Sequence, residues 1–309
     1  MPYPLGVYFG PTFMTAAHAL EDGKVVPVAK IECSIGYQDF FNDNLSRKVE
    51  SKLETLPEEN PAGRNYPVID QKQLFTEALG SIKSEVERVL GQPADVQAIV
   101  TPYHWDDGIR MVVWDAAVAS GILLGGTHML NRLPKAVFRA QDMSIGRPQD
   151  QYNVLMVDYN TNYLHFLICE VAWDVCAIEG QVQLPELGEK SALKHAKVQE
   201  GDSEDPHWSE VRRSLNTFVE LAKARLGDYK FITLSGEAEE TMGEMRRLLE
   251  SFPDSEAKGK LVNNDSIPPL YAAAFGAARA AKAQTDDPKT TRDFLSFPDP
   301  IPEEPRSSS

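Results

Sequence analysis

The sequence lacks the features that mark membrane proteins and disulfide-stabilised proteins. No window approaches the ~18 consecutive apolar residues that a membrane span needs, and the first lysine is Lys24, so no basic leader segment is expected. The chain has three cysteines, Cys33, Cys169 and Cys176, an odd number without the spacing of metal ligands. We therefore expect reduced thiols, no membrane contact, no metal site, and a cytoplasmic or nuclear location.

Basic residues are also scarce. Lysines and arginines number 31 against 46 aspartates and glutamates, which gives a formal net charge of -15. A nucleic-acid backbone binds clustered lysines and arginines, and the sequence has no such cluster, so we expect no nucleic-acid contact. The length of 309 residues and the 42% hydrophobic composition instead indicate a globular protein with room for two cores.

The same order of predicted elements occurs twice along the chain. Residues 5–30 are typical of three strands separated by a tight polar turn and by a second turn at 21–24. Residues 153–180 have the same plan. In both halves a helix, a strand, a helix, a strand and a helix are expected to follow. This internal duplication predicts an α/β protein with a first lobe over residues 1–150 and a second lobe over residues 151–283.

Apolar periodicity and glycine or proline positions set the bounds of these later elements. In the first half we expect helices at 72–90 and 107–120, strands at 96–102 and 122–126, and a helix opened by Leu133-Pro134. In the second half we expect helices at 208–226, 238–250 and 270–283, and strands at 229–235 and 260–264.

Three segments fall outside the repeat. Residues 42–70 mix charge with asparagine, proline and glycine, which predicts a surface excursion. Residues 186–206 are predicted to form a mobile insert. Residues 284–309 are acidic and rich in proline, with few apolar side chains, which predicts a disordered tail.

The succession of these elements resembles the nucleotide-binding domain of DnaK-type heat-shock chaperones, within the actin-like ATPase superfamily. The strings that carry the resemblance are AIVTPYHWDDGIRMVVWDAAVASG at 98–121, LPKAVFRA at 133–140, YKFITLSGEAEETMGEMRRLL at 229–249 and IPPLYAAAFGAARAA at 267–281. The resemblance covers roughly residues 5–282. It implies two duplicated ribonuclease-H-like lobes with a central cleft, as in the actin/heat-shock-chaperone/sugar-kinase fold.

The resemblance also implies a phosphate site between two hairpin turns, where backbone N–H groups hold the phosphates of ATP or ADP with Mg²⁺. Carried over by position, the candidate nucleotide-binding residues are Gly10, Thr12 and Phe13 in the first turn, Asp158, Asn160, Thr161 and Asn162 in the second turn, and Ser235 and Gly236 in the adenosine loop.

Both turns depart from the family pattern. The family's Asp-Leu-Gly-Thr-Thr is Tyr8-Phe9-Gly10-Pro11-Thr12 here, so an acid is lost and a proline removes one N–H donor. The family's Asp-Leu-Gly-Gly-Gly-Thr falls at 158–163, where the aspartate is kept and all three glycines are lost. Two further family acids fall at Leu133 and His165. Phosphoryl transfer depends on metal positioning and charge stabilisation, so we expect no catalytic residues and no efficient ATP hydrolysis.

Three functions remain open. A degraded site in an intact frame predicts a non-catalytic pseudo-ATPase that requires no cofactor and acts through contact with an unidentified protein partner. The alternative is a weak ATP/ADP-binding switch or slow ATPase that closes on nucleotide through Asp158, Thr12 and Gly236. Asp158 can equally be a residue that stabilises its own turn. A small-molecule kinase would need a carboxylate base, for which Asp106 and Asp107 are candidates, although both are placed as at a helix N-terminus.

Overall fold

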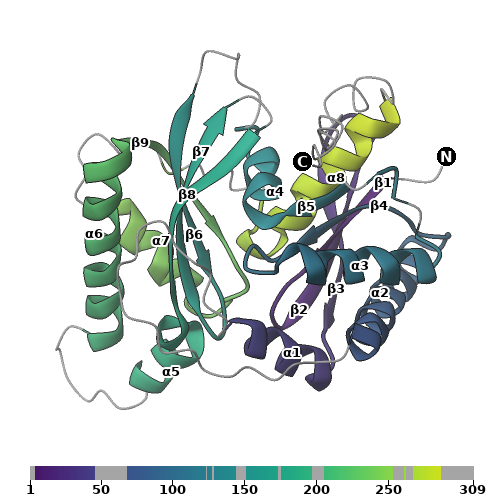
Figure 1. Cartoon of the computed structure of the whole chain (residues 1–309), viewed down its shortest axis with the longest axis horizontal. Coiled ribbons are helices and arrows are strands. Elements are labelled where there is room, and N and C mark those ends of the chain that lie inside the picture. The colour runs from purple at the N-terminus through teal and green to yellow at the C-terminus, as the bar shows by residue number, and fades with distance from the viewer. Residues whose placement is uncertain are drawn as a thin grey trace, which may run out of the picture.

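The first half of the chain forms a five-stranded mixed sheet (Figure 1). The computed structural model describes residues 4–45, 68–122, 124–126, 129–143, 151–172, 175–196, 205–252, 261 and 267–286. The strands are β1 (Pro4–Phe9), β2 (Phe13–Ala19), β3 (Val25–Glu32), β4 (Asp95–Thr101) and β5 (Leu130–Arg132), in the order β3-β2-β1-β4-β5. The first three strands pair antiparallel, whereas β1 with β4 and β4 with β5 pair parallel.

The second half forms a separate sheet with the same plan. Its strands are β6 (Tyr152–Tyr159), β7 (Leu164–Ala172), β8 (Val175–Leu184) and β9 (Tyr229–Ser235), in the order β8-β7-β6-β9. The first three again pair antiparallel, and β6 pairs parallel with β9. Leu261 makes a parallel bridge to Ile232 of β9, at the position that β5 takes beside β4. The chain is therefore an α/β protein with two mixed sheets whose first three strands are arranged alike.

Helices cover the outer face of each sheet and fill the space between the sheets. They are α1 (Ile35–Leu45), α2 (Val68–Leu90), α3 (Asp107–Ala119), α4 (Leu133–Ala140), α5 (Glu189–Ala196), α6 (Pro206–Leu226), α7 (Met242–Glu250) and α8 (Ala272–Asp286). Short 3-10 turns at Pro185–Leu187 and Pro269–Tyr271 precede α5 and α8. In the parts of the chain that the structure describes, no helix is both long and apolar enough to cross a membrane.

Two outer cores define two lobes. α1, α2 and α3 pack on the first sheet and form the first lobe with it, around buried aromatic rings that include Phe9, Phe75 and Trp105. α6 and α7 pack on the second sheet and form the second lobe with it and α5. Burial of these apolar faces, at roughly 25 cal/mol per Å² of apolar surface removed from water, stabilises each lobe.

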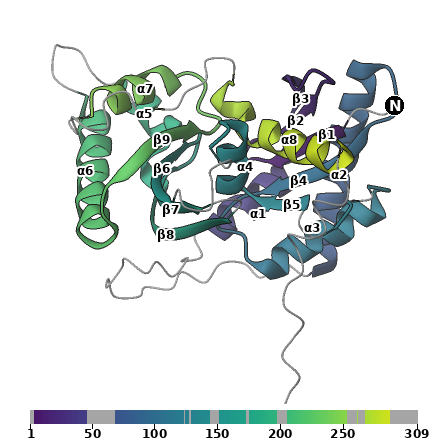
Figure 2. The same cartoon turned by 90° about the horizontal axis from the view of Figure 1, so that it is seen from above.

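α4 and α8 lie between the two sheets, where a third core joins the lobes (Figure 2). α8 packs on β1 and β2 of the first lobe and against α4, although it belongs to the second half of the sequence. Small residues permit this close packing. A Cβ added to Gly276 of α8 would lie 1.8 Å from the Ala136 carbonyl oxygen of α4, and one added to Gly6 of β1 would lie 2.2 Å from the Ala278 nitrogen.

Most predicted elements are confirmed, but the strand predicted at 122–126 is wrong. The described residues there are irregular, and the third parallel strand is β5, a few residues later. The apolar run at 122–126 contains Gly125, whose added Cβ would lie 1.8 Å from the Gln284 side chain. The segment therefore passes close beneath the end of α8 instead of joining the sheet. The strand predicted at 260–264 is described only at Leu261.

The predicted irregular segments also need correction. Residues 42–45 form the last turn of α1, which the sequence analysis did not predict, and residues 46–67 lie outside the described part. The predicted insert at 186–206 contains α5, whose first residue Glu189 is buried. Residues 284–286 continue α8, and the rest of the predicted tail lies outside the described residues.

Candidate functional site

The first hairpin turn joins β1 to β2 and is held mainly by its own lobe. The Gly10 N–H donates to the Phe13 carbonyl oxygen (3.1 Å), and the Tyr37 hydroxyl of α1 donates to the Gly10 carbonyl oxygen (3.0 Å). The Thr12 carbonyl accepts from the Cys33 N–H (2.8 Å). A Cβ at position 10 would lie 2.4 Å from the Phe13 oxygen, so this tight turn needs glycine.

The second hairpin turn joins β6 to β7 and keeps its shape without glycine. The Asn160 N–H donates to the Tyr163 carbonyl oxygen (2.9 Å). The Asn160 carbonyl accepts from the Glu189 N–H at the start of α5, and the Thr161 carbonyl accepts from Lys190, both at 3.0 Å. The Asn162 side chain donates to Asn42 of α1 (3.2 Å). Contacts with α5 and α1 thus cover the loop that the resemblance assigns to phosphate.

Asp158 is the penultimate residue of β6, and its carboxylate is buried. One oxygen, Oδ1, accepts from the Ser235 hydroxyl (2.7 Å), and the other, Oδ2, accepts from the Asn160 amide (2.8 Å) and the Tyr163 hydroxyl (3.1 Å). Burial raises the pKa of Asp158, and these three hydrogen bonds oppose the rise. Asp158 therefore stabilises its own turn and the adjacent β9 loop, and its oxygens are already occupied by protein donors.

Gly236 follows β9 and lies in the loop that the resemblance assigns to adenosine. This loop packs against the second turn. Its φ is +122°, and an added Cβ would lie 1.9 Å from the Tyr159 carbonyl oxygen. Only glycine fits such a backbone conformation at such a close approach. This conformation directs the next residue, Glu237, toward the first lobe.

Glu237 joins the two turns across the lobe boundary. Its Oε2 accepts from the Phe13 N–H of the first turn (3.0 Å), while its own N–H donates to the Asn160 Oδ1 of the second turn (3.1 Å). The side chain and the backbone of Thr12 add hydrogen bonds to the same carboxylate. A carboxylate of the protein thus lies where N–H groups of the first turn converge, a position suited to any anion.

The electrostatics of this junction favour a proton on Glu237. Burial raises its pKa to about 7, against the opposing hydrogen bonds from Thr12 and Phe13, and the nearby Asp158 adds to the rise. Burial also raises the pKa of Tyr8 well above its usual value. Two buried polar atoms here, Glu237 Oε1 and the Tyr8 hydroxyl, have no hydrogen-bond partner within the described chain. The junction is consequently tight, buried and acidic.

The nine candidate residues are brought to one place. Gly10, Thr12, Phe13, Asp158, Asn160, Thr161, Asn162, Ser235 and Gly236 all lie in the three loops that meet at this junction. The sequence analysis missed Glu237. The available signal was an acid directly after the glycine of the third loop, where the backbone lies closest to the other lobe.

Further contacts across the boundary flank the junction. The Phe41 ring of α1 stacks on Tyr163, with the ring centres 6.3 Å apart, and the Gln183 side chain of β8 donates to the Leu45 carbonyl (3.1 Å). On another side Lys30 of β3 pairs with Glu239 (2.6 Å). Contacts at α1 and at the loop after β9 therefore hold the two lobes together.

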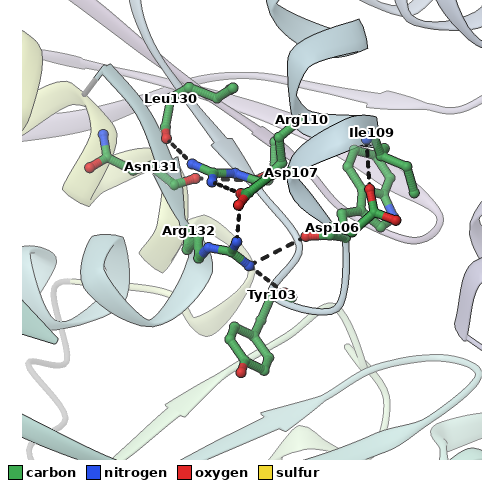
Figure 3. Close-up of polar contacts among 10 residues, drawn as sticks. Tyr103, Asp106, Asp107, Ile109, Arg110, Leu130, Asn131 and Arg132 are labelled. Carbon is green, nitrogen blue, oxygen red and sulfur yellow. Dashed lines mark hydrogen bonds and ion pairs between the residues drawn. The ribbon is translucent and has the colours of Figure 1, made fainter. Parts of the chain in front are cut away.

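The two acids considered as a kinase base have structural partners (Figure 3). Asp106 is the N-cap of α3, and its Oδ1 accepts from the Ile109 N–H (2.8 Å). Asp107 forms ion pairs with Arg110 (2.7 Å) and Arg132 (2.8 Å). The hydrogen bond from Arg110 and the charge of Arg132 lower the pKa of Asp107, which makes it a weaker base. Their interpretation as helix N-terminal residues is confirmed.

No protein-family model and no curated protein sequence matches this chain. Among the described residues, no group of three or more His, Cys, Asp or Glu side chains is arranged to hold a metal ion. The residues at the junction also fit a nucleotide phosphate with Mg²⁺ poorly, because Glu237 occupies the amides of the first turn and the Asp158 oxygens are bonded to protein.

Proposed function

We propose that this chain is a non-catalytic protein of the actin/heat-shock-chaperone/sugar-kinase fold, with two ribonuclease-H-like lobes, that acts through contact with another protein. The repeated strand order and the two helices between the sheets support the fold assignment. The family resemblance gives the lobes a nucleotide cleft, and the chain's own side chains fill the corresponding position. The two packed lobes then serve as a rigid surface that binds the other protein.

The observation that carries the proposal is the hydrogen bond between the Phe13 N–H and the Glu237 carboxylate. In the resembling family this turn would hold a phosphate oxygen, and a carboxylate is a smaller anion with the same preference for N–H donors. A nucleotide would have to displace Glu237 from its partners in the first turn. It would also have to coordinate its metal without the acid that Tyr8 replaces, and both requirements weaken binding.

The second candidate is a weak ATP/ADP switch. One observation favours it: the raised pKa of Glu237 means that its carboxylate is held with difficulty, so an outside anion could compete for the first turn. In this alternative, nucleotide binding would separate Glu237 from Phe13 and open the junction. The two candidates therefore differ in whether ATP stabilises the native state.

Titration calorimetry and thermal unfolding with ATP or ADP, each with and without Mg²⁺, separate these candidates. The proposal predicts no binding heat, no rise in melting temperature and no phosphate release, because a ligand stabilises a fold only as far as it occupies the native state. The matched variant is Asp158→Ala. Micromolar ATP binding by the natural chain that is lost in this variant would reject the non-catalytic proposal and establish the switch.

The partner contact is tested by recovering the chain at its natural abundance and identifying what copurifies in a fixed ratio. We expect such a partner to remain bound when ATP, ADP or a Mg²⁺ chelator is added, because no step of the contact depends on nucleotide. Release by ATP would favour the switch. If the chain is recovered at its cellular concentration without any partner, the result contradicts the proposed role in protein contact.

A further inference from the structure

His195 and His207 are neighbours on the second lobe, in α5 and α6. His195 is in the last turn of α5 and is exposed, whereas His207 is in the first turn of α6 and is buried. The centres of the two imidazole rings are 6.2 Å apart, with an angle of 33° between the ring planes. One ring is thus open to solvent and the other is fixed in the protein beside it.

His207 is an exception among buried polar side chains. Its exposed fraction is 2%, yet neither ring nitrogen has a hydrogen-bond partner within the described chain. A buried polar atom without a partner costs roughly 1–3 kcal/mol, so native proteins rarely leave one without a ligand or a water molecule. The backbone of His207 is held separately, because its N–H donates to Asp205 Oδ1 (2.8 Å). The backbone of His207 is therefore fixed, whereas its ring nitrogens lack hydrogen-bond partners within the described chain.

We propose that His195 and His207 together bind one divalent transition-metal ion of the Zn²⁺ type, with water completing the coordination. Neutral imidazole is a preferred ligand of such ions. Each metal–nitrogen bond is about 2 Å, so each ring centre lies roughly 3.2 Å from the ion, and at the angle of a tetrahedral ion the two ring centres would be ~5.2 Å apart. The observed separation is about 1 Å larger than this estimate. The exposed His195 ring therefore has to rotate toward His207 when the ion binds.

Two features of the surroundings favour a cation. The last turn of α5 carries the negative end of its helix dipole beside His195, and Asp205 contributes a negative charge near His207. This site has two protein ligands, which agrees with the finding that the described residues hold no cluster of three or more.

Calorimetry with Zn²⁺ on the full chain, free of a histidine tag and treated with a chelator, tests the site. We expect one saturable ion per chain at pH 7 and no comparable binding of Mg²⁺, which prefers oxygen ligands. His195→Ala should weaken Zn²⁺ affinity at least ~10-fold, since one of two protein ligands is lost. His195 is exposed, so this variant should keep its fold, as an unchanged unfolding curve would establish.

Lys194→Ala is the matched control, because Lys194 is the exposed neighbour in the same helical turn and has no ligand atom for this ion at neutral pH. It should bind Zn²⁺ as the natural chain does. X-ray absorption of the Zn²⁺ complex should show two imidazole ligands, and one fewer in His195→Ala. Equal affinity in His195→Ala and the natural chain, or no saturable one-to-one binding, would overturn the proposal and assign water to the His207 nitrogens.

Discussion

The two hairpin turns occupy equivalent places in the two lobes, yet their backbone groups are satisfied in different ways. The first turn keeps its glycine, and its Phe13 N–H is bonded by Glu237 from the other lobe. The second turn contains no glycine, and its Asn160 N–H and the carbonyls of Asn160 and Thr161 are bonded within their own lobe. The Phe13 N–H therefore takes its partner across the lobe boundary, whereas these groups of the second turn do not.

This difference shows two ways in which the backbone groups of a tight turn are satisfied without a ligand. A turn with unsatisfied N–H groups needs an anion, and an N–H left buried without a partner costs free energy. In the second turn, the Tyr163 carbonyl accepts from the Asn160 N–H, and N–H groups of α5 donate to the carbonyls of Asn160 and Thr161. In the first turn, a single carboxylate supplies the partner, so the lobe junction depends on the charge state of one residue. The following predictions test this contrast, from the largest expected effect to the smallest.

Gly236→Ala should have the largest effect, because it acts on the loop that carries Glu237 between the turns. The added Cβ would lie 1.9 Å from the Tyr159 oxygen at a φ of +122°. Backbone strain and steric overlap together should lower the free energy of unfolding by about 4 kcal/mol. Urea unfolding measures this change. Gly243→Ala, at a helical site with no atom within 4 Å of the added Cβ, should leave stability equal or slightly higher. Equal effects of the two substitutions would contradict the packing of this loop.

The pH dependence of stability should reveal the carboxylate of Glu237. Its pKa is about 7 in the folded chain and 4.5 as an ordinary glutamate, so the folded state binds the proton more tightly. The associated stability is fully present below pH 4.5 and is lost as the pH rises through about 7. Because each pKa unit is worth about 1.4 kcal/mol, the complete change corresponds to roughly 3 kcal/mol.

Glu237→Gln provides the reference for this measurement, since its amide oxygen can accept the Phe13 N–H but does not titrate. The difference in unfolding free energy between the natural chain and this variant should move by that amount between pH 4.5 and pH 8, with the natural chain losing relative stability. A constant difference over this range would show that Glu237 is not buried at the junction.

Asp158→Asn should destabilise the second turn by about 2 kcal/mol, because the new amide group would face the donors Ser235, Asn160 and Tyr163 without accepting from all of them. Asp22→Asn, on an exposed turn, should leave stability almost unchanged. Chemical unfolding compares the two. We further expect the Phe13 amide to keep its slow hydrogen exchange in Asp158→Asn, since the first turn takes its partner from Glu237. Rapid exchange there would show that the turns are not independent.

Local sequence patterns were sufficient for most elements but not for the contacts between lobes. The meanders at β1–β3 and β6–β8 were predictable because turn residues separate short apolar strands, and the ends of α2 and α6 were predictable from Gly91 and Gly227, whose positive φ ends a helix. α1 was missed because its apolar residues span only a few turns and precede a long polar segment. α5 was missed because its composition is polar.

The candidate site shows the same limit. The resemblance assigned the nine candidate residues to three turns, and the structure brings these turns together. The role of Glu237 could not be predicted, because its partner Phe13 is 224 residues away in the sequence. Local sequence patterns do not indicate contacts between such distant residues. The resemblance predicted an altered phosphate site, and the folded chain shows that the Glu237 carboxylate accepts from the Phe13 N–H.

Lys30→Ala should have the smallest effect, although it also removes a contact between lobes. Lys30 pairs with Glu239 (2.6 Å) and lies over the Phe13 ring, 3.9 Å from its centre. The side chain of Glu239 is 56% exposed, so solvent screens the pair and its loss should cost only ~0.5–1 kcal/mol. Unfolding in low and high salt separates the two contributions, because salt weakens the ion pair and leaves most of the ring contact. Glu239→Gln removes the ion pair alone and should lose the salt dependence while keeping part of the stability. An effect of Lys30→Ala as large as that of Gly236→Ala would mean that the exposed pair, and not the buried Glu237, holds the lobes together.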